Sequence, residues 1–239
     1  MSEISCRITS LKAVSDTLIL RMRPQLEFNF VAGQYLLLSF DGEHFKPFSI
    51  ASTPTDEDIE LHIRDNPNDP LENRLLEIYR AKESLKLKDP SGECTLNRVA
   101  MDRPILYIAG GTGYAPCHAM IRTLFTIENR PTVSVYWGAA QAKELYLHGD
   151  LQLWASQQTG FNYVPVVQFP SNDDVTTYRT GFVHQAVLDD GLALADYDIY
   201  LSGSGIMVGH VHTALVKAGA SPEHIFSDMI DLGMAQFPE

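Results

Sequence analysis

The sequence has few cysteines and none of the spacings that cysteine chemistry needs. Its three cysteines, Cys6, Cys94 and Cys117, are widely separated and form no C-x-x-C pair. Zinc sites, iron–sulfur clusters and disulfide frameworks require closely spaced or numerous cysteines, so none of them is indicated. Three reduced thiols are what we expect of a chain that stays in the cytoplasm.

Long apolar runs and basic charge are also scarce. No window approaches about 18 consecutive apolar residues, and the N-terminus, MSEISCRITS, lacks the basic start and apolar stretch of a secretion signal. The net charge is −12, from 30 acidic and 18 basic residues. Because a nucleic-acid backbone needs a clustered basic face, we expect neither nucleic acid nor a membrane as a partner.

The pattern of apolar residues changes near residue 100. Before it, short alternating stretches such as 59–64 are separated by turns at intervals of roughly 8 to 15 residues, which is typical of an antiparallel barrel. Segment 69–82 has helical spacing and is expected to cap one end of that barrel. After Pro104, strand-like runs alternate with helix-like ones: 105–109, 116–126, 133–136, 143–156, 163–167, 181–188, 199–201 and 207–218.

This alternation predicts a doubly wound parallel sheet with helices on both faces. The sequence therefore predicts two domains in its 239 residues. Residues 1–98 form an antiparallel six-stranded β-barrel, and residues 99–239 form an α/β domain. Each is long enough to bury a core of its own.

The stretch 104–120, PILYIAGGTGYAPCHAM, joins an apolar run to a glycine-rich turn. A turn with so few Cβ atoms can bring backbone N–H groups close to a ligand, and a following helix adds the positive end of its dipole. The spacing matches neither the G-x-G-x-x-G dinucleotide motif nor a P-loop. By itself the stretch fits a phosphate site and equally a tight turn that binds nothing.

The eight histidines do not indicate a metal site. His118, His210 and His212 fall on predicted helices without carboxylates at metal-ligand spacing, and H-E-x-x-H is absent. Gly-Ser-Gly at 203–205 lacks the spacing of a nucleophile elbow. We predict neither a metal centre nor a Ser-His-Asp triad.

Three segments, in this order, resemble motifs of the ferredoxin–NADP⁺ reductase superfamily and, within it, of the NAD(P)H:flavin oxidoreductases. FKPFSIAS at 45–52 is similar to the family's Arg-x-Tyr/Phe-Ser flavin motif. IAGGTGYAP at 108–116 is similar to its pyridine-nucleotide turn, and YLSGSGIM at 200–207 to the late turn beside the nicotinamide. VYWG at 135–138 and AGQY at 32–35 extend the resemblance over nearly the whole chain.

The resemblance implies a flavin site on the barrel, formed by Lys46, Pro47, Phe48, Ser49, His62, Ile63 and Arg64. Ser49 would hydrogen-bond near flavin N5, the atom that receives hydride, and is the catalytic candidate. Lys46 stands where the family usually has Arg. A flavin phosphate would therefore meet the point charge of an ammonium group in place of a planar guanidinium with paired donors. Segment 65–70, DNPNDP, offers two acids and no Gly, Ser or Thr, which favours a flavin that comes and goes as a substrate.

The resemblance also implies a nicotinamide-nucleotide site formed by Gly110, Gly111, Thr112, Gly113, Tyr114, Pro116, Trp137, Gly138, Ser202 and Gly203. The pyrophosphate would lie on 110–113, the adenosine ribose beside Trp137 and Gly138, and the nicotinamide beside Ser202. Met207 is expected to pack as a helix residue. Segment 139–143 has no arginine for a 2′-phosphate, which favours NADH, or NADH and NADPH without sharp discrimination.

These features imply an NAD(P)H:flavin oxidoreductase that passes hydride to free riboflavin, FMN or FAD without a protein acid or base. Reduced flavin would then serve a flavin-dependent monooxygenase, a ferric complex or oxygen. Two alternatives stay open: an FAD-containing reductase that hands electrons to a protein partner, and a non-catalytic flavin or nucleotide carrier. Phe226 and Phe237 are the candidates to cover the flavin ring, although Phe226 fits a strand core better.

Overall fold

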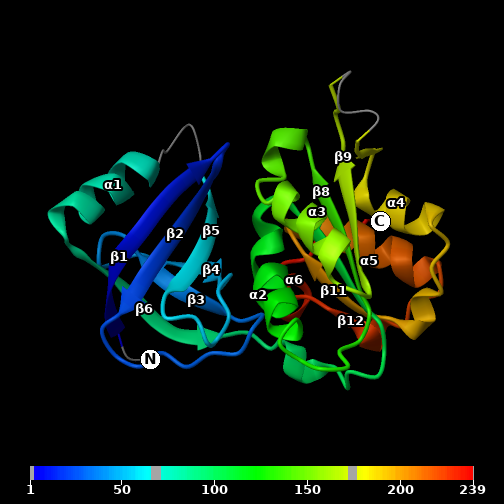
Figure 1. The fold of residues 1–239 in the computed structure, drawn as a ribbon, viewed down its shortest axis with the longest axis horizontal. Helices are drawn as coiled ribbons and strands as arrows, with labels where there is room; N and C mark the ends of the chain where they lie inside the picture. Colours follow the sequence, from blue (N-terminus) through cyan, green and yellow to red (C-terminus); the bar gives the residue numbers. More distant parts are fainter. Residues whose placement is uncertain (1–2, 66–70, 172–176, 239) are drawn as a thin grey trace.

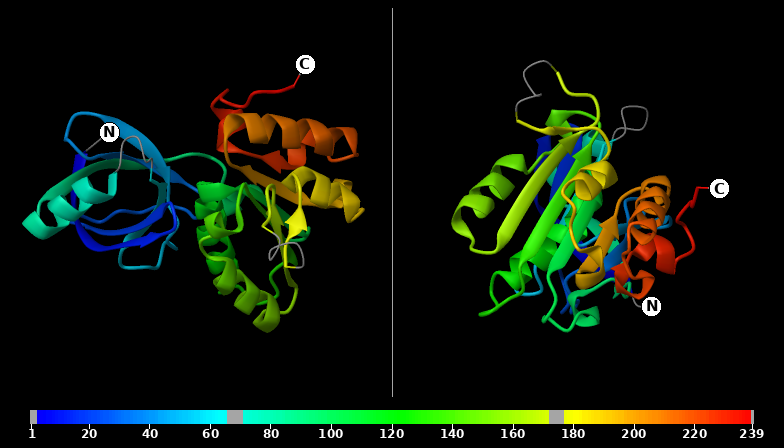
Figure 2. Two further views of the ribbon diagram at one scale, coloured as in Figure 1. Left: turned by 90° about the horizontal axis from the view of Figure 1, so that it is seen from above. Right: turned by 90° about the vertical axis from the view of Figure 1, so that its right-hand side faces the viewer.

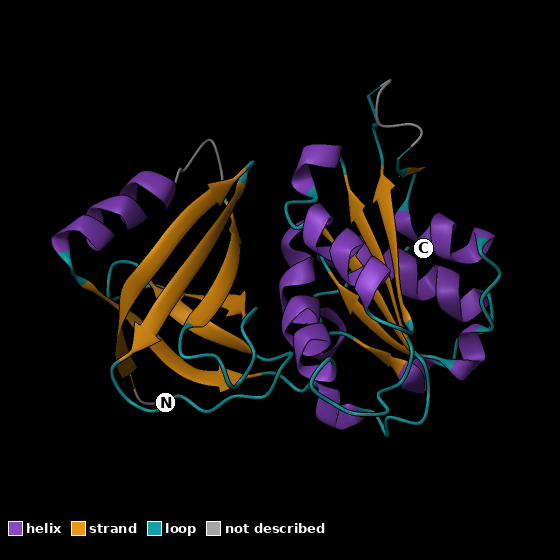
Figure 3. Cartoon of the chain, viewed as in Figure 1, coloured by secondary structure: helices purple, strands orange, loops and turns teal. Residues whose placement is uncertain are grey.

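The computed structural model describes residues 3–65, 71–171 and 177–238, and it consists of a barrel beside a layered α/β domain (Figures 1 and 3). Six strands form one antiparallel sheet in the order β4-β3-β6-β1-β2-β5. Their bounds are β1 (Glu3–Val14), β2 (Thr17–Pro24), β3 (Tyr35–Ser39), β4 (Phe45–Ser49), β5 (Ile59–Arg64) and β6 (Ser84–Ser91). A bridge between Ile50 and Leu61 joins the two edges, so the sheet closes as predicted.

Alternating side chains fill the barrel. Leu18, Leu20 and Met22 of β2 point inward, as the period of two along a strand requires. Helix α1 (Leu71–Ala81) places Leu75 and Ile78 in the same core and lies over one end of the barrel (Figure 1). This confirms the capping helix; the first two residues of the predicted segment 69–82 lie outside the described residues.

The second sheet is parallel and has the order β10-β9-β8-β7-β11-β12. Its strands are β7 (Ile105–Gly110), β8 (Val133–Ala139), β9 (Phe161–Val167), β10 (Arg179–Thr180), β11 (Asp198–Ser202) and β12 (Ile225–Phe226). The helices between them are α2 (Tyr114–Leu124), α3 (His148–Gln157), α4 (Val183–Asp189), α5 (Gly205–Lys217) and α6 (Asp228–Asp231). Short 3₁₀ turns occupy η1 (Leu96–Arg98), η2 (Gly111–Gly113), η3 (Ala142–Glu144), η4 (Leu194–Asp196) and η5 (Pro222–His224).

Helices cover both faces of this sheet (Figure 2). Tyr107 and Ala109 of β7 pack in one core with α2 and α3, whereas Leu106 and Ile108 pack in the other core with α4 and α5. Such a strand has to be apolar on both faces, which explains the continuous run that predicted it. The doubly wound fold is confirmed.

Strand order reverses between β7 and β11. From β7 the sheet grows through β8 and β9 on one side, while β11 and β12 lie on the other. Ligands of open α/β sheets bind in the crevice at such a reversal, beyond the carboxyl ends of the strands. Both glycine-containing turns, after β7 and after β11, lie at this point, and α2 faces the barrel (Figure 1).

One predicted helix is interrupted in the structure. The helix expected over 143–156 is the 3₁₀ turn η3 followed, after a break, by α3 from His148. Leu145 and Leu147 leave the helical conformation, and Leu145 and Tyr146 are buried in the core, so packing interrupts the helical pattern. No helix in the described part of the chain is both long and apolar enough to span a membrane.

The two sheets are joined by residues 92–104, which contain η1. The boundary between residues 98 and 99 falls within this connection, and we retain it as a proposal.

Candidate active site

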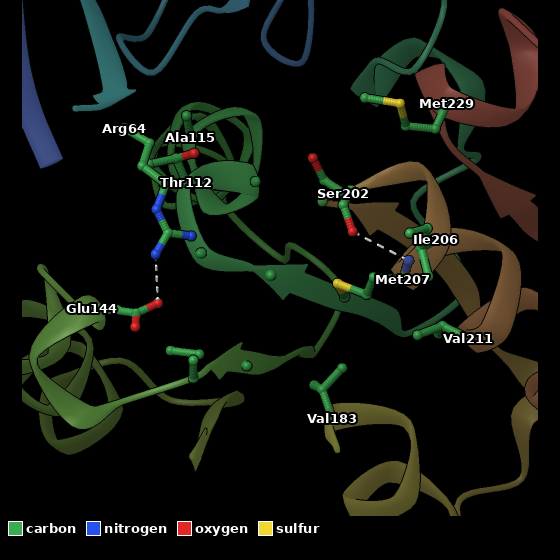
Figure 4. A pocket seen from close by; sticks show the side chains of 18 of the residues that line it. Arg64, Thr112, Ala115, Glu144, Val183, Ser202, Ile206, Met207, Val211 and Met229 are labelled. Atoms are coloured by element: carbon green, nitrogen blue, oxygen red, sulfur yellow. Dashed lines mark hydrogen bonds and ion pairs between the residues drawn. The ribbon is translucent and has the colours of Figure 1, made fainter. Parts of the chain in front are cut away.

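A cleft of about 1160 Å³ runs between the barrel and the α/β domain (Figure 4). The ends of β4 and β5 form one wall, and the turns after β7 and β11 form the other. It brings together most of the residues expected to bind flavin and nucleotide: Pro47, Phe48, Ser49, His62, Ile63, Arg64, Gly110, Gly111, Thr112, Gly113, Gly138, Ser202 and Gly203. Segments far apart in the sequence therefore face one another across a single space.

The turn after β7 is open to the cleft at Gly111. This residue has a φ of 53°, and a Cβ added to it would meet only the Arg64 guanidinium, at 3.8 Å. Helix α2 begins immediately after the turn. An anion placed on Gly111 would therefore lie at the positive end of the α2 dipole, without side-chain obstruction.

The two glycine-containing turns touch at Gly113. A Cβ at this position would lie 2.5 Å from the carbonyl oxygen of Ser202 and 2.7 Å from the nitrogen of Gly203. Backbone on both sides leaves no room for a side chain. The close approach of the two turns therefore explains the glycine at position 113. The glycine does not by itself indicate phosphate binding.

Met207 lies closer to the ligand space than the sequence suggested. Its Sδ packs against Gly110 and Gly203, and the residue lines the cleft. Ser204 caps α5 by accepting a hydrogen bond from the Met207 amide at 3.3 Å (Figure 4). Since side chains in the first turn of a helix lean back toward its N-terminus, Met207 covers the glycines. Met207 also packs against the core beneath α4 and α5, as expected of a helix residue.

Ser49 ends β4 and faces the nucleotide side of the cleft. It pairs with Tyr35 in the barrel sheet. Together with Ser202 and Met229 it also lines a small adjoining cavity of about 50 Å³. Ser49 and Ser202, predicted to lie beside the two reacting rings, thus border the same space.

Lys46 lies outside this arrangement. It is exposed on β4, and the cleft meets that strand only at its last three residues. The predicted contact of Lys46 with a flavin phosphate thus has no support from its position.

Arg64 is the one Lys or Arg among the described residues that line the cleft. Its Nη2 contacts Asp16 Oδ2 at 2.9 Å and Glu144 Oε2 at 3.0 Å. Glu144 belongs to η3 of the other domain and is buried, so the pair crosses the domain boundary (Figure 4). Nη1 remains directed toward Gly111. An anionic ligand on the turn would find this cation in place.

Three residues predicted to bind the nucleotide do not line the cleft. Trp137 is fully buried, stacks on Tyr114 at 4.4 Å, and donates its indole N–H to the Gly111 carbonyl at 2.9 Å. Both aromatic rings therefore support the glycine turn from the core, and the predicted contact of Trp137 with the adenosine ribose does not fit this position. Pro116 borders only the small adjoining cavity.

Other lining residues were missed: Ala115, Ala139, Ala140, Glu144, Gln168, Gly181, Phe182, Val183, His184, Ser204, Ile206, His210, Val211 and Met229. Those that follow β8 and β9 could have been found from the rule that ligands bind beyond the carboxyl ends of parallel strands. Neither that rule nor any motif in the sequence pointed to Met229. Neither Phe226, buried in β12, nor Phe237, packed on His212 of α5, lines the cleft.

A buried polar cluster adjoins the cleft where the domains meet. The Glu60 carboxylate accepts hydrogen bonds from Arg21 Nε at 2.6 Å and His62 Nε2 at 2.9 Å. Because a carboxylate only accepts, His62 carries a proton on Nε2, and its Nδ1 is hydrogen-bonded to the Tyr146 hydroxyl at 3.0 Å. Burial by itself would raise the Glu60 pKa, but the bonds from His62 and Arg21 outweigh it and lower that pKa to about 2.

His118 of α2 completes the cluster. Its Nδ1 donates to the Ala51 carbonyl at 3.0 Å, and its ring stacks on Trp154 at 5.6 Å. Burial, reinforced by the neighbouring His62, lowers the pKa of His118 to about 4. His118 is therefore neutral at pH 7.

Glu60, His62 and His118 place one ligand atom each within 4.8 Å of one another, a set that could hold a divalent metal. Here the Glu60 carboxylate is already occupied by Arg21 and by a direct bond from His62. The cluster is therefore a satisfied hydrogen-bond network. Sequence reasoning missed it because spacing along single helices cannot reveal residues brought together from β5 and α2.

The barrel, the paired glycine turns and the cleft between them define a two-domain oxidoreductase architecture for a flavin and a nicotinamide nucleotide. Two family models match the chain in agreement with this: an FAD-binding domain over residues 4–106 and an oxidoreductase NAD-binding domain over residues 107–213.

Known relatives are similar over nearly the whole chain. A CDP-6-deoxy-L-threo-D-glycero-4-hexulose-3-dehydrase reductase of Yersinia pseudotuberculosis is 33% identical over 93% of this chain and 67% of its own length. An NAD(P)H-flavin reductase of Aliivibrio fischeri is 29% identical over 94% and 97%. The crystal structure of the cytochrome P450 reductase GcoB from Amycolatopsis matches with a TM-score of 0.85, 26% identity, and coverage of 95% and 69%. A probable flavin reductase of Photobacterium leiognathi is 30% identical over 83% of this chain and 86% of its own length. The chain belongs to the NAD(P)H:flavin reductase family.

Proposed function

We propose that this protein oxidises NAD(P)H and reduces a free flavin. The observation that carries the proposal is the single cleft that joins Ser49, at the end of β4, to the turns at Gly113 and Ser202. Its volume of about 1160 Å³ is at the upper end for one small-molecule site and suits two ligands together. The barrel side would hold the flavin on the residues predicted for it, and the glycine turns would hold the nicotinamide nucleotide.

In this reaction the nicotinamide supplies a hydride from C4 and the flavin accepts it at N5. The protein's part is to bind both molecules with their rings in contact and to exclude water. Ser49 offers a hydroxyl to the flavin edge, and Gly111 offers an unobstructed backbone to the pyrophosphate. Met207 limits how far the nicotinamide can enter between the turns.

The charges in the cleft favour flavin as a substrate over flavin as a permanent cofactor. Among the described lining residues Arg64 is the one strong cation, and two carboxylates already share it. Lys46 is exposed and does not line the cleft. Segment 65–70 also supported this interpretation, and its residues 66–70 lie outside the described part of the chain. A flavin phosphate thus finds little to hold it tightly.

The absorption spectrum of the purified protein and a steady-state assay test this proposal together. We expect colourless protein that oxidises NADH only when riboflavin, FMN or FAD is added. Near-stoichiometric flavin that survives gel filtration would show a bound cofactor. Flavin binding without any NADH consumption would instead indicate a carrier.

NADH is the proposed preferred reductant. The described residues at the nucleotide end of the cleft, Gly138, Ala139, Ala140 and Gln168, include no Lys or Arg for a 2′-phosphate. The nearby Arg179 is paired with Asp190 at 2.7 Å. We expect kcat/KM to be higher for NADH than for NADPH, and a reversed ratio would contradict the assignment.

A second candidate function is a reductase that passes electrons to a protein. It is favoured by the similarity to the Yersinia dehydrase reductase and to the P450 reductase. Co-purification with a redox partner that accepts electrons from NADH without added flavin would establish it. Under the main proposal, the reduced flavin diffuses to a flavin-dependent monooxygenase or a ferric complex.

We further propose that the protein works in the cytoplasm. In support, Cys6, Cys94 and Cys117 are all unpaired and buried, as thiols kept in a reducing compartment are. Fractionation of cells that produce the protein tests this location.

A further inference from the structure

Two buried hydrogen bonds join the nucleotide domain to the barrel at β5 and at the segment after β4. The Tyr146 hydroxyl is hydrogen-bonded to His62 Nδ1 of β5 at 3.0 Å, and His118 donates to the Ala51 carbonyl at 3.0 Å. Tyr146, His62 and His118 are all buried. Arg122 with Asp56 and Arg64 with Glu144 also link the nucleotide domain to the barrel, but both arginines are partly exposed. Water and salt screen such pairs, so they fix the geometry less strictly. Tyr200 and Asp231 bond instead to Thr95 and Arg98, in the connection between the two sheets.

On the barrel side, each bond ends on a segment that forms the flavin wall. His62 immediately precedes Ile63 and Arg64, which line the cleft. Ala51 follows Ser49 by two positions and is itself tied to β5, since its amide donates to the Glu60 carbonyl at 2.8 Å. The two bonds thus attach the nucleotide domain to both strands that border the proposed flavin site.

In the nucleotide domain, each bond involves a residue of the elements that pack against the glycine turn after β7. His118 lies on α2, the helix that begins directly after Gly113. Tyr146 packs edge-on against Trp137 at 5.1 Å, and Trp137 holds the Gly111 carbonyl through its indole N–H. Each bond therefore connects the scaffold of the nucleotide turn to the scaffold of the flavin wall.

We propose that Tyr146 and His118 are positioning residues that set the distance and angle between the flavin and nicotinamide rings. The inference rests on the proposed hydride transfer. A purely apolar interface tolerates small sliding motions, whereas a buried hydrogen bond that is broken leaves both its partners unsatisfied. The Arg21–Glu60 pair continues this series of hydrogen bonds into the barrel. Because Glu60 also holds His62, the His62 ring cannot rotate to find another partner.

The central experiment compares Tyr146→Phe with Tyr163→Phe. Tyr163 makes the same kind of bond, from its hydroxyl to His148 Nδ1 at 3.0 Å, but entirely within the nucleotide domain. Because a misplacement of about 1 Å can cost about 100-fold in rate, we expect Tyr146→Phe to slow single-turnover hydride transfer by about tenfold or more. The KM values for NADH and riboflavin should stay within about twofold, because the ligand contacts are unchanged. Tyr163→Phe should leave the rate near that of wild type.

A pair of substitutions tests the second bond. In His118→Asn the amide nitrogen can occupy the place of Nδ1 and still donate to Ala51, whereas His118→Leu cannot donate. Both lose the stacking on Trp154. We expect the leucine variant to slow hydride transfer and to raise the primary deuterium isotope effect with 4-deuterated NADH, and the asparagine variant to retain most of the rate. Equal losses in both, or none in either, would overturn the proposal for His118.

Amide hydrogen exchange, without any ligand, separates this inference from the proposed function. Tyr146→Phe should accelerate exchange in residues 50–52 and 59–64, and Tyr163→Phe should not. If the wild type fails to reduce flavin, the proposed function fails, and exchange still shows whether Tyr146 holds the barrel. Unchanged exchange in Tyr146→Phe, or an equal loss of rate in Tyr163→Phe, would refute the positioning role.

Discussion

Acidification should destabilise this protein through His118 at a higher pH than through the neighbouring Glu60 carboxylate. Burial and the neighbouring His62 lower the pKa of His118 from 6.5 to about 4. The unfolded chain therefore takes up a proton at a higher pH than the folded protein does. Stability attributable to this group is complete above pH 6.5, and it is lost as the pH falls toward 4.

The size of the effect follows from the shift. One unit of pKa difference corresponds to about 1.4 kcal/mol, so the full shift is worth about 3 kcal/mol, with about 2 kcal/mol already lost at pH 5. Glu60 also destabilises the protein on acidification, but at a lower pH. Its pKa is lowered from 4.5 to about 2, so its contribution to the free energy of unfolding is lost as the pH falls below 4.5. Asp228 acts in the opposite direction, because burial raises its pKa to about 6 and favours the folded state as the pH falls through 6.

Urea unfolding of wild type and His118→Asn at pH 7.5, 6, 5 and 4.5 isolates the histidine. Asp228 and Glu60 titrate in both proteins, so the difference between the two curves removes them to first order. The wild type should be the more stable at pH 7.5, and its advantage should shrink by about 2 kcal/mol at pH 5. His44→Asn, at an exposed histidine, is the control and should follow the wild type.

A difference between wild type and His118→Asn that stays constant from pH 7.5 to 4.5 would refute this reasoning. It would mean that His118 has the same pKa in the folded protein as in the unfolded chain, because the folded protein accommodates its charge. A difference that grows on acidification would show the opposite sign, namely a histidine stabilised in its charged form by Glu60.

Three further predictions concern the cleft. Gly113→Ala should lower the free energy of unfolding by about 3 kcal/mol in urea titrations, because its Cβ would meet the Ser202 carbonyl at 2.5 Å, whereas Gly149→Ala, with nothing within 4 Å, should be nearly neutral. Ser49→Ala should lower kcat for riboflavin reduction by about 10- to 100-fold in a steady-state assay, since the flavin edge loses a hydroxyl; an unchanged kcat would exclude that role. Arg64→Ala should raise the KM for NADH about tenfold at low salt and less at high salt, and equal effects at both would argue against a phosphate contact.

Much of the fold could be predicted because the signals for it are local. The run at 105–109 is apolar on both faces because both faces are covered. The turn at 110–113 is rich in glycine because the backbone at Ser202 and the Met207 side chain approach it closely. The alternation along 59–64 follows the pleat of a strand in the barrel wall. Each pattern reflects the environment of neighbouring residues along one element.

The site was predicted less completely, because side-chain direction depends on packing between elements. Trp137 lies in the VYWG segment that resembles the family's motifs, yet it faces the core and supports the turn. Met207 was expected to pack as a helix residue. Glycines in the turns after β7 and β11 also leave room for its sulfur beside the cleft. Lys46 falls within the flavin motif, yet the cleft does not reach it.

The sequence by itself determined the two domains, their order, and the strand ends from which the glycine-containing turns project, since apolar periodicity and turn chemistry are properties of short segments. Only the tertiary structure decided how those turns face each other. The bonds from Tyr146 to His62 and from His118 to Ala51 join residues 84 and 67 positions apart in the chain. No periodic pattern encodes such a contact, because it exists only when the two folded surfaces meet.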